Sequence, residues 1–297
     1  MNATREIIVQ GGSQLAFQRA EPQKLAPVLT GAEPVVLGVE IGMSQTRIAQ
    51  IGPKGVLKGK IKTIETPGNA EDLLSLVGRA THHILGDRRP NVVGVSVPQL
   101  SADGSQVLSR HRSLEMGGLT SATSLTTDVS NATGLNDSQA CIVFDRVSSG
   151  AVGELANQRH IVPRVMGDGL FVDRYRYAIG AAAWRENGLV VPYGSEIDEV
   201  DYNGAVAQVL SQYQQQPDFD INQIRVTHPY QVALHGAVKG LRAALAVASG
   251  GESPSVQSAT YREDFAIVGA ALGAVELSEG RDVTVLHKGL TDSSGGK

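Results

Sequence analysis

Apolar and polar positions at the start of the chain alternate in short segments, which is typical of strands. A continuous apolar run covers 35–39, and an alternating stretch follows through 47–51. After the turn signal Pro53-Lys54-Gly55, strand-like segments recur at 56–57 and 60–62. The pattern predicts three strands joined by tight turns.

The next segment has the period of a helix and carries signals at both ends. Its apolar residues recur every three or four positions, which places them on one face. Asn69 is suited to cap the N-terminus, and Gly86 is suited to end the helix. The predicted apolar stripe comprises Leu73, Val77, Ala80 and Ile84.

Strand and helix patterns continue along the rest of the chain. The clearest is a hairpin, because Asn187-Gly188 separates two strand-like runs and suits the positive φ of a tight hairpin turn. Its two strands are predicted over 175–185 and 189–192. The other predicted elements are strands over 91–97 and 139–144 and helices over 119–133, 148–159, 204–213, 237–248 and 265–277.

This order of elements predicts a mixed α/β protein with two halves that meet near residue 160. The first half covers 34–160 and the second covers 161–290. Residues 1–33 mix Gly and Pro with no core pattern and are expected to form an N-terminal extension. The Ser- and Gly-rich residues 291–297 are expected to be a disordered tail.

Composition restricts the partners and the environment. The chain has 297 residues, 41% of them hydrophobic, and a formal net charge of −4, so nothing favours nucleic acid or an anionic membrane as a partner. Cys141 is the only cysteine, which excludes an intramolecular disulfide and favours a reducing compartment. No apolar run approaches the ~20 residues that span a bilayer. We therefore expect a soluble cytoplasmic protein.

Several segments together carry a resemblance to a known family. The run GVEIGMSQTR at 38–47 resembles the first phosphate segment of the ROK family of glucokinase-like sugar kinases. VVGVSVP at 92–98 resembles the next glycine-containing strand of that family, and 141–154 resembles the segment with its catalytic aspartate. The hairpin with the following 194–197, and later 267–272, match further family segments. Their order and approximate spacing follow the family through most of the chain.

The resemblance implies an α/β fold of two ribonuclease-H-like (actin-like ATPase) lobes with a central cleft. It also implies ATP and Mg²⁺ as cofactors if the protein is active, a small sugar as ligand, and a homodimer. The repressor branch of the family is not expected, because residues 1–33 are too short and too broken by Pro and Gly to form a helix-turn-helix.

Asp145 is the catalytic candidate. In the family, the matching aspartate contacts the sugar and acts as the general base when a sugar hydroxyl attacks the γ-phosphate. The residues alone favour another role just as well, because an Asp at this point can cap the helix that begins near Ser148. Phe144 stands where the family has a sugar-binding Asn. Both roles of Asp145 stay open.

The phosphate-binding candidates lie in two turns. By the resemblance, Glu40 would support the Mg²⁺ shell, and Gly42 and Ser44 would face the phosphates. The alternative is a strand-end Glu beside an ordinary turn. In the second turn, Arg176-Tyr177-Ala178 replace the family's glycines, and bulky side chains would obstruct a phosphate. Another placement, at Gly167-Asp168-Gly169, would set a carboxylate against the phosphate.

The remaining candidates follow from the resemblance alone. Gly180 and Gly236 would contact the nucleotide, the latter within Leu234–Val238, which resembles the family's adenosine loop. Glu196 and Ser113 would contact the sugar. Ordinary loop, strand or helix positions are the alternative for each. No metal ligands are assigned, and a ROK-type zinc site is excluded because one cysteine cannot supply its cluster.

Two functions are compatible with these residues. Phosphoryl transfer depends on positioning and charge stabilisation, and the changes affect both phosphate turns and the sugar site. The favoured function is therefore a pseudokinase with a regulatory or structural role. The alternative is an active ATP- and Mg²⁺-dependent kinase for a hexose or an amino sugar, with Asp145 as the base and Glu196 holding the sugar.

Overall fold

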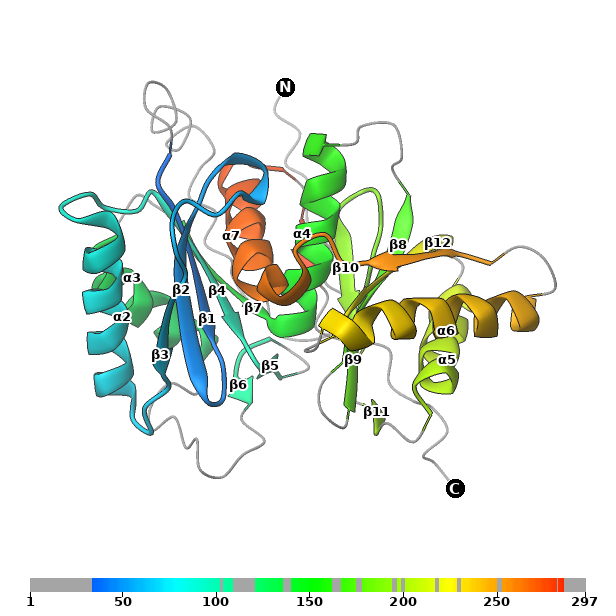
Figure 1. The fold of residues 1–297 in the computed structure, drawn as a ribbon. Helices are drawn as coiled ribbons and strands as arrows, with labels where there is room; N and C mark the ends of the chain where they lie inside the picture. The colour runs from blue at the N-terminus through cyan, green and yellow to red at the C-terminus, as the bar shows by residue number, and fades with distance from the viewer. Residues whose placement is uncertain are drawn as a thin grey trace, which may run out of the picture.

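In the computed structural model, two β-sheets lie side by side, with helices outside them and between them (Figure 1). The predicted extension at 1–33 and the predicted tail at 291–297 lie outside the described residues. The structure describes residues 34–101, 104–108, 121–135, 140–161, 167–174, 178–193, 197–198, 201–216, 219–228, 231–249, 253–281 and 283–285.

The first sheet confirms the strands predicted at 35–39, 47–51, 91–97 and 139–144. The prediction of a strand over 56–62 is wrong in position, because residue 57 makes only an isolated bridge with Ile51 and the third strand begins at residue 62. β1 pairs antiparallel with β2 and parallel with β4, and β3 and β7 lie at the two edges. The short turn η2 (Pro53–Gly55) leads from β2 towards β3, and a small ribbon of β5 (Gln99–Leu100) and β6 (Val107–Leu108) follows β4. The spatial order of the sheet is β3 (Lys62–Glu65), β2 (Gln45–Ile51), β1 (Val36–Ile41), β4 (Val92–Val97) and β7 (Ala140–Asp145).

Two helices cover the outer face of the first sheet, α2 (Ala70–Leu85) and α3 (Ala122–Thr133). The predicted ends of α2 are confirmed. The side chain of Asn69 accepts the backbone N–H of Asp72 at 2.9 Å, and Gly86, at φ 63°, donates its N–H to the carbonyl of His82 at 2.8 Å. The cap bonds satisfy backbone groups that a helix end leaves without partners.

The second sheet repeats the strand order of the first. In each sheet the first strand in sequence is central. The second and third strands follow on one side, each antiparallel to its neighbour, and two later strands lie on the other side, each parallel to its neighbour. The short strands β11 (Ile197–Asp198) and β14 (Thr284–Val285) pair with β9 and β10. The five main strands are, in spatial order, β13 (Ser255–Ser258), β12 (Ile221–Thr227), β8 (Asp168–Arg174), β9 (Ala178–Trp184) and β10 (Leu189–Pro192).

The predicted hairpin is confirmed as β9 and β10. Gly188 has φ 101°, and the N–H of Arg185 donates to the carbonyl of Leu189 at 2.7 Å across the turn. Helices α5 (Tyr202–Gln214) and α6 (Gln231–Ser249) cover the outer face of the second sheet. The helical period of the sequence predicts only the later part of α6, from Ala237 onwards, whereas the helix begins at residue 231.

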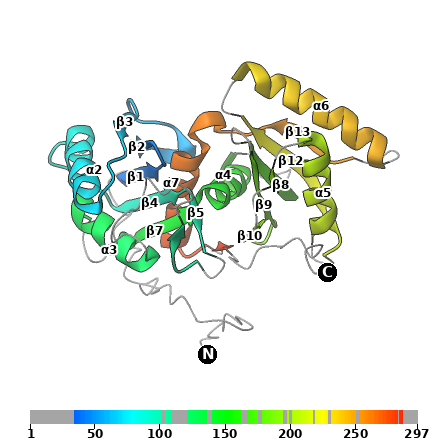
Figure 2. The ribbon, with the colours of Figure 1, turned by 90° about the horizontal axis from the view of Figure 1, so that it is seen from below.

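Each of the two central helices packs against the sheet of the other half of the chain. Helix α4 (Arg146–Ile161) follows the last strand of the first sheet but packs against the second sheet, where Leu155 joins a cluster with Phe171 and Trp184. Helix α7 (Phe265–Ser278) follows the second sheet but packs against the first, where Ile267 joins a cluster with Val36. Figures 1 and 2 show both helices between the two sheets. The main strands before residue 160 belong to the first sheet and those after it to the second. The two central helices nevertheless hold the halves together, because each contacts the sheet of the other half.

Glycines allow the backbones of α4, α7 and β4 to approach one another closely. A Cβ atom built on Gly269 of α7 would overlap the carbonyl oxygen of Ser149 in α4. On Gly94 of β4, it would overlap the carbonyl of Ala270 in α7 and lie 2.5 Å from the N atom of Ala271. Glycine at these positions lets backbone pack directly on backbone.

Cys141 is buried in β7, and burial raises the pKa of its thiol to about 12, so the thiolate is scarce near neutral pH.

In the described part of the chain, no helix combines the length and the apolar character that a bilayer crossing needs.

Candidate functional site

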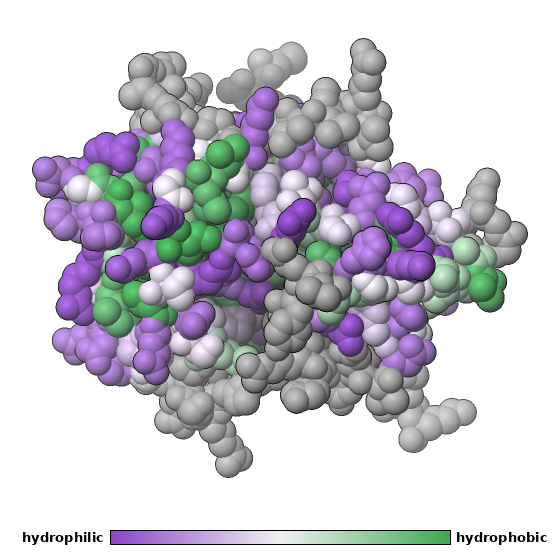
Figure 3. Space-filling view, in the orientation of Figure 1, coloured by the Kyte–Doolittle hydropathy of each residue, from purple (hydrophilic) through white to green (hydrophobic). Residues whose placement is uncertain are grey.

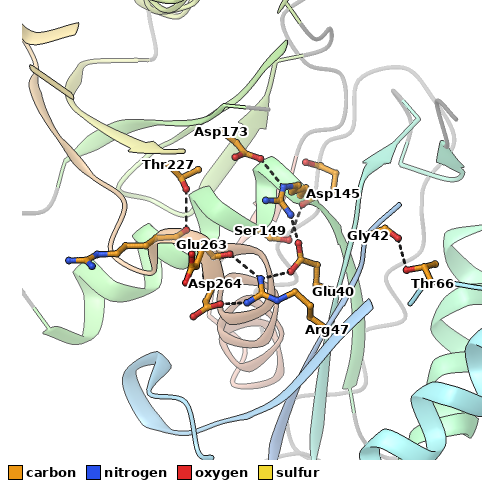
Figure 4. Close-up of polar contacts among 12 residues, drawn as sticks. Glu40, Gly42, Arg47, Thr66, Asp145, Ser149, Asp173, Thr227, Glu263 and Asp264 are labelled. Atoms are coloured by element: carbon orange, nitrogen blue, oxygen red, sulfur yellow. Dashed lines mark hydrogen bonds and ion pairs between the residues drawn. The ribbon is translucent and has the colours of Figure 1, made fainter. Parts of the chain in front are cut away.

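Charged side chains meet in the middle of the molecule, where the two sheets and the two central helices approach one another (Figure 4). The alternation of strand side chains explains this position. In β1, Leu37, Val39 and Ile41 face the outer helices, so Glu40 faces the central layer. In β8, Leu170 and Val172 face α5 and α6, so Asp173 likewise faces the centre.

Five residues form what we call the central charge cluster. They come from β1, β2, the start of α4, the end of β8 and the residue before α7, and salt bridges link them into one network. They are Glu40, Arg47, Arg146, Asp173 and Asp264.

Both carboxylate oxygens of Glu40 are bound by arginines of the same chain. Nη1 of Arg47 donates to Oε2 of Glu40 at 3.0 Å, and Nη1 of Arg146 contacts Oε1. The Glu40 side chain is only 7% exposed, so the guanidiniums replace most of the hydration that the carboxylate loses on burial. Glu40 therefore has a guanidinium on each carboxylate oxygen.

Arg146 connects the two sheets. Its Nε donates to Oδ2 of Asp173 at 2.8 Å while its Nη1 contacts Glu40. Its guanidinium also lies 4.5 Å from the centre of the Phe265 ring, a cation–π contact with the first residue of α7. Arg146 thus bridges an acid of the first sheet and an acid of the second.

Arg47 joins the cluster to the segment at 259–264, between β13 and α7. Its Nη1 donates to the carbonyl of Glu263 at 3.1 Å, and its Nη2 contacts the Asp264 carboxylate. The 3₁₀ turn η4 (Arg262–Asp264) lies in this segment, and Arg262 has φ 47°. Thr227 holds that turn by donating its hydroxyl to the Arg262 carbonyl at 3.1 Å.

A buried acid of α4 anchors the same segment. Glu154 accepts the backbone N–H of Thr260 at 2.5 Å and its hydroxyl at 2.8 Å. Burial raises the pKa of Glu154, while the two Thr260 bonds and the charge of Arg225 act in the opposite direction. The segment is therefore fixed to both halves of the molecule.

Asp145 caps helix α4, which is the structural one of its two predicted roles. Its Oδ1 accepts the backbone N–H of Ser148 at 2.8 Å, and its Oδ2 accepts the Ser148 hydroxyl at 2.6 Å. The residue is buried, and both oxygens are engaged within the chain. A general base needs an oxygen that a substrate hydroxyl can reach.

Replacing Asp145 with alanine is expected to lower the free energy of unfolding by about 1–2 kcal/mol, the usual loss for an N-cap residue. Asn retains an acceptor for the Ser148 N–H, so Asp145→Asn is expected to lose clearly less. Urea denaturation of both variants measures the difference. Equal losses for Ala and Asn would show that the cap bond is not what Asp145 contributes.

Gly42 and Ser44 lie in the tight turn between β1 and β2, as predicted. The N–H of Gly42 donates to the carbonyl of Gln45 at 2.9 Å, and its own carbonyl accepts the Thr66 hydroxyl at 2.9 Å. Ser44 is exposed. The Gly42 amide is thus used inside the turn, whereas a phosphate cradle needs outward-facing amides.

The nucleotide candidates of the second half are spread apart. Gly180 is buried within β9. Leu234–Val238 is not a loop, which corrects that expectation: the whole segment lies in α6, with Gly236 exposed on the helix. Gly167-Asp168-Gly169 is not a phosphate turn either, because it opens β8, and Asp168 accepts the backbone N–H of Glu186 at 3.0 Å.

Other predicted residues lie outside the described part of the chain. They are Ser113 and Glu196 of the sugar site and Arg176 and Tyr177 of the second phosphate turn. Of the predicted site residues that are described, only Glu40 belongs to the central charge cluster, and Asp145 directly precedes Arg146.

Mg²⁺ and ATP would require a set of ligands at the centre of the molecule. Among the described residues, no group of three or more His, Cys, Asp or Glu side chains is arranged to hold a metal ion. Mg²⁺ binds through carboxylate oxygens, and those of Glu40 already carry two guanidiniums. The cluster contains three acids and two arginines, an excess of one negative charge, which disfavours a triphosphate. These residues therefore do not fit a Mg²⁺-nucleotide.

The fold is similar to solved structures of sugar kinases. A polyphosphate/ATP-glucomannokinase from Arthrobacter sp. strain KM matches with a TM-score of 0.57 and 19% identity, over 82% of this chain and 99% of that one. A ROK family glucokinase from Streptomyces griseus, solved with glucose and AMPPNP, matches with a TM-score of 0.55 and 14% identity, over 82% and 99%.

A third solved structure has a similar fold over a similar share of the chain. A ROK family protein from Streptococcus pneumoniae TIGR4, solved with sucrose, matches with a TM-score of 0.57 and 14% identity, over 83% of this chain and 99% of that one. No protein-family model and no curated protein matches the sequence. At these identities the likeness establishes the fold: this chain has the mixed α/β fold of the ROK sugar kinases, as the sequence resemblance predicted.

Proposed function

We propose that this chain is a pseudokinase with a regulatory or structural role, in which internal ion pairs fill the phosphate and metal centre of a sugar-kinase fold. Its two sheets share one strand order, which supports a description as two ribonuclease-H-like lobes around a central site. The proteins of similar fold include a glucokinase solved with glucose and a nucleotide analogue. We therefore compare the centre of this fold with the ligand site of a sugar kinase.

The observation that carries the proposal is the binding of Glu40 by two arginines. Glu40 is the residue that the first phosphate motif assigns to the Mg²⁺ shell. Arg146 and Arg47 occupy its two oxygens, and Arg146 also neutralises Asp173 from the second sheet. A guanidinium stays charged at physiological pH, so the two arginines supply to Glu40 the positive charge that a metal ion would supply there.

The state of Asp145 supports the same conclusion. Its oxygens accept two hydrogen bonds from Ser148 and cap α4, which immediately begins with Arg146. The base of the kinase reaction and the metal-shell acid are thus both engaged in holding the structure. Phosphoryl transfer depends on positioned groups, and two of them serve other purposes here.

A turnover assay tests the proposal. Purified protein with ATP, Mg²⁺ and a panel of hexoses and amino sugars is expected to release no ADP above the background without sugar, as followed by a coupled enzyme assay. Asp145→Asn is expected to leave that background unchanged. Sugar-dependent turnover that Asp145→Asn abolishes would overturn the proposal and identify an active sugar kinase.

A further inference from the structure

A surface pocket on the second half is built from different residues than the central charge cluster. Its volume is about 450 Å³, which is in the range of small-molecule sites, about 300–1,000 Å³. It lies between α6 and the strand β13 at the edge of the second sheet. Its lining residues are His235, Val238, Lys239, Arg242, Gln257 and Ser258.

The helical period gathers the basic side chains of this pocket. Positions 235, 239 and 242 are separated by four and three residues, so they lie on one face of α6. Val238 beside them is 7% exposed and gives the pocket an apolar wall. In the view of Figure 3 the surface over the middle of α6 is mainly hydrophilic, and hydrophobic colour gathers towards its C-terminal end, where Val247 is 86% exposed.

Hydrogen bonds with the strands leave donors for a ligand. Nε of Arg242 donates to the carbonyl of Val256 at 2.8 Å, which fixes the guanidinium against β13 and leaves its two terminal nitrogens. Oε1 of Gln257 accepts from Nη1 of Arg225 at 2.5 Å, which leaves the Gln257 amide nitrogen as a donor. The Lys239 ammonium only donates. None of the six described residues that line the pocket is acidic.

We infer that this pocket binds the phosphate group of a small phosphorylated metabolite. Two permanent cations, Lys239 and Arg242, match the charge of a phosphate monoester, which is about −1.5 to −2 at neutral pH. Arg and Lys form short charge-assisted hydrogen bonds with phosphate oxygens, and the Ser258 hydroxyl and the Gln257 amide add neutral donors. The pocket volume exceeds that of the phosphate group, so the organic part lies against Val238.

Isothermal titration with inorganic phosphate and with glucose 6-phosphate tests this inference on the full chain. Both probes are expected to bind saturably, and the monoester is expected to bind more tightly because it fills more of the pocket. Lys239→Ala combined with Arg242→Ala is expected to weaken both at least about tenfold, the effect of losing a charge-assisted hydrogen bond. Arg79→Ala, at an exposed position of α2, is the matched control and is expected to leave binding unchanged.

Three results would overturn the inference. They are no saturable binding of either probe at millimolar concentration, equal binding by the double variant and the wild type, and equal affinity for free phosphate and the monoester. Since Arg242 holds β13, the single variant Lys239→Gln is measured as well. Lys239 makes no hydrogen bond or salt bridge in the described structure, so this variant is expected to fold normally and still bind more weakly.

Discussion

Replacing Arg146 with methionine is expected to lower the free energy of unfolding by about 3–5 kcal/mol, the range for removing one partner of a buried ion pair. The reason is that one guanidinium serves two acids. The side chains of Glu40 and Asp173 are 7% and 3% exposed, so water cannot replace the lost charge. Urea denaturation at neutral pH measures the loss.

Two further variants define the cause of that loss. Adding Asp173→Asn to Arg146→Met removes an uncompensated acid, so the double variant is expected to regain part of the lost stability. Arg79→Met, on the exposed face of α2, is the control and is expected to change stability by less than about 0.5 kcal/mol. A loss of less than about 1 kcal/mol for Arg146→Met would mean that the pair behaves as an exposed one.

Replacing Gly269 with alanine is expected to lower the free energy of unfolding by about 3 kcal/mol or more, or to prevent folding. The added Cβ would overlap the carbonyl oxygen of Ser149 and lie 2.7 Å from its carbonyl carbon. Both atoms are backbone of α4, so no side chain can rotate away, and the two central helices would have to separate. Because α4 and α7 each pack on the other half, this separation would disturb both sheets.

Gly236→Ala is the matched substitution in another helix. Gly236 is exposed in α6, and nothing lies within 4 Å of a Cβ built there. Alanine is expected to stabilise the protein by up to about 1 kcal/mol, because glycine is the poorer helix former. Urea denaturation of both variants, with circular dichroism as the check on folding, measures the contrast. Similar effects of the two substitutions would contradict the close crossing of α4 and α7.

Local signals in the sequence predicted much of the fold. The cap at Asn69, the stop at Gly86 and the Asn187-Gly188 hairpin each depend on a few neighbouring residues, and all three are confirmed. The strands β8, β12 and β13 were not predicted. In β13 only Val256 is buried, so no apolar run marks the strand, and its pairing with β12 is non-local. The start of α6 was missed because Gly236 resembled part of a loop.

The candidate site could be predicted only in part, because its contacts join distant parts of the chain. The motifs identified Glu40 and Asp145. Arg146 lies 106 residues from Glu40, and Arg47 lies 217 residues from Asp264, so no local pattern reveals either pair. One signal was present: Asp173 follows three apolar residues in LFVD, and an acid at the end of a buried strand indicates a partner or a site.

Calorimetric titration of the Lys239→Ala/Arg242→Ala variant with Mg²⁺-ATP tests the central claim most directly, because this variant lacks the cations of the pocket beside α6. If Arg47 and Arg146 occupy the place of a metal ion beside Glu40, no binding heat is expected at millimolar nucleotide. A dissociation constant in the micromolar range would contradict this account, because it would show that a metal-bound triphosphate displaces both guanidiniums.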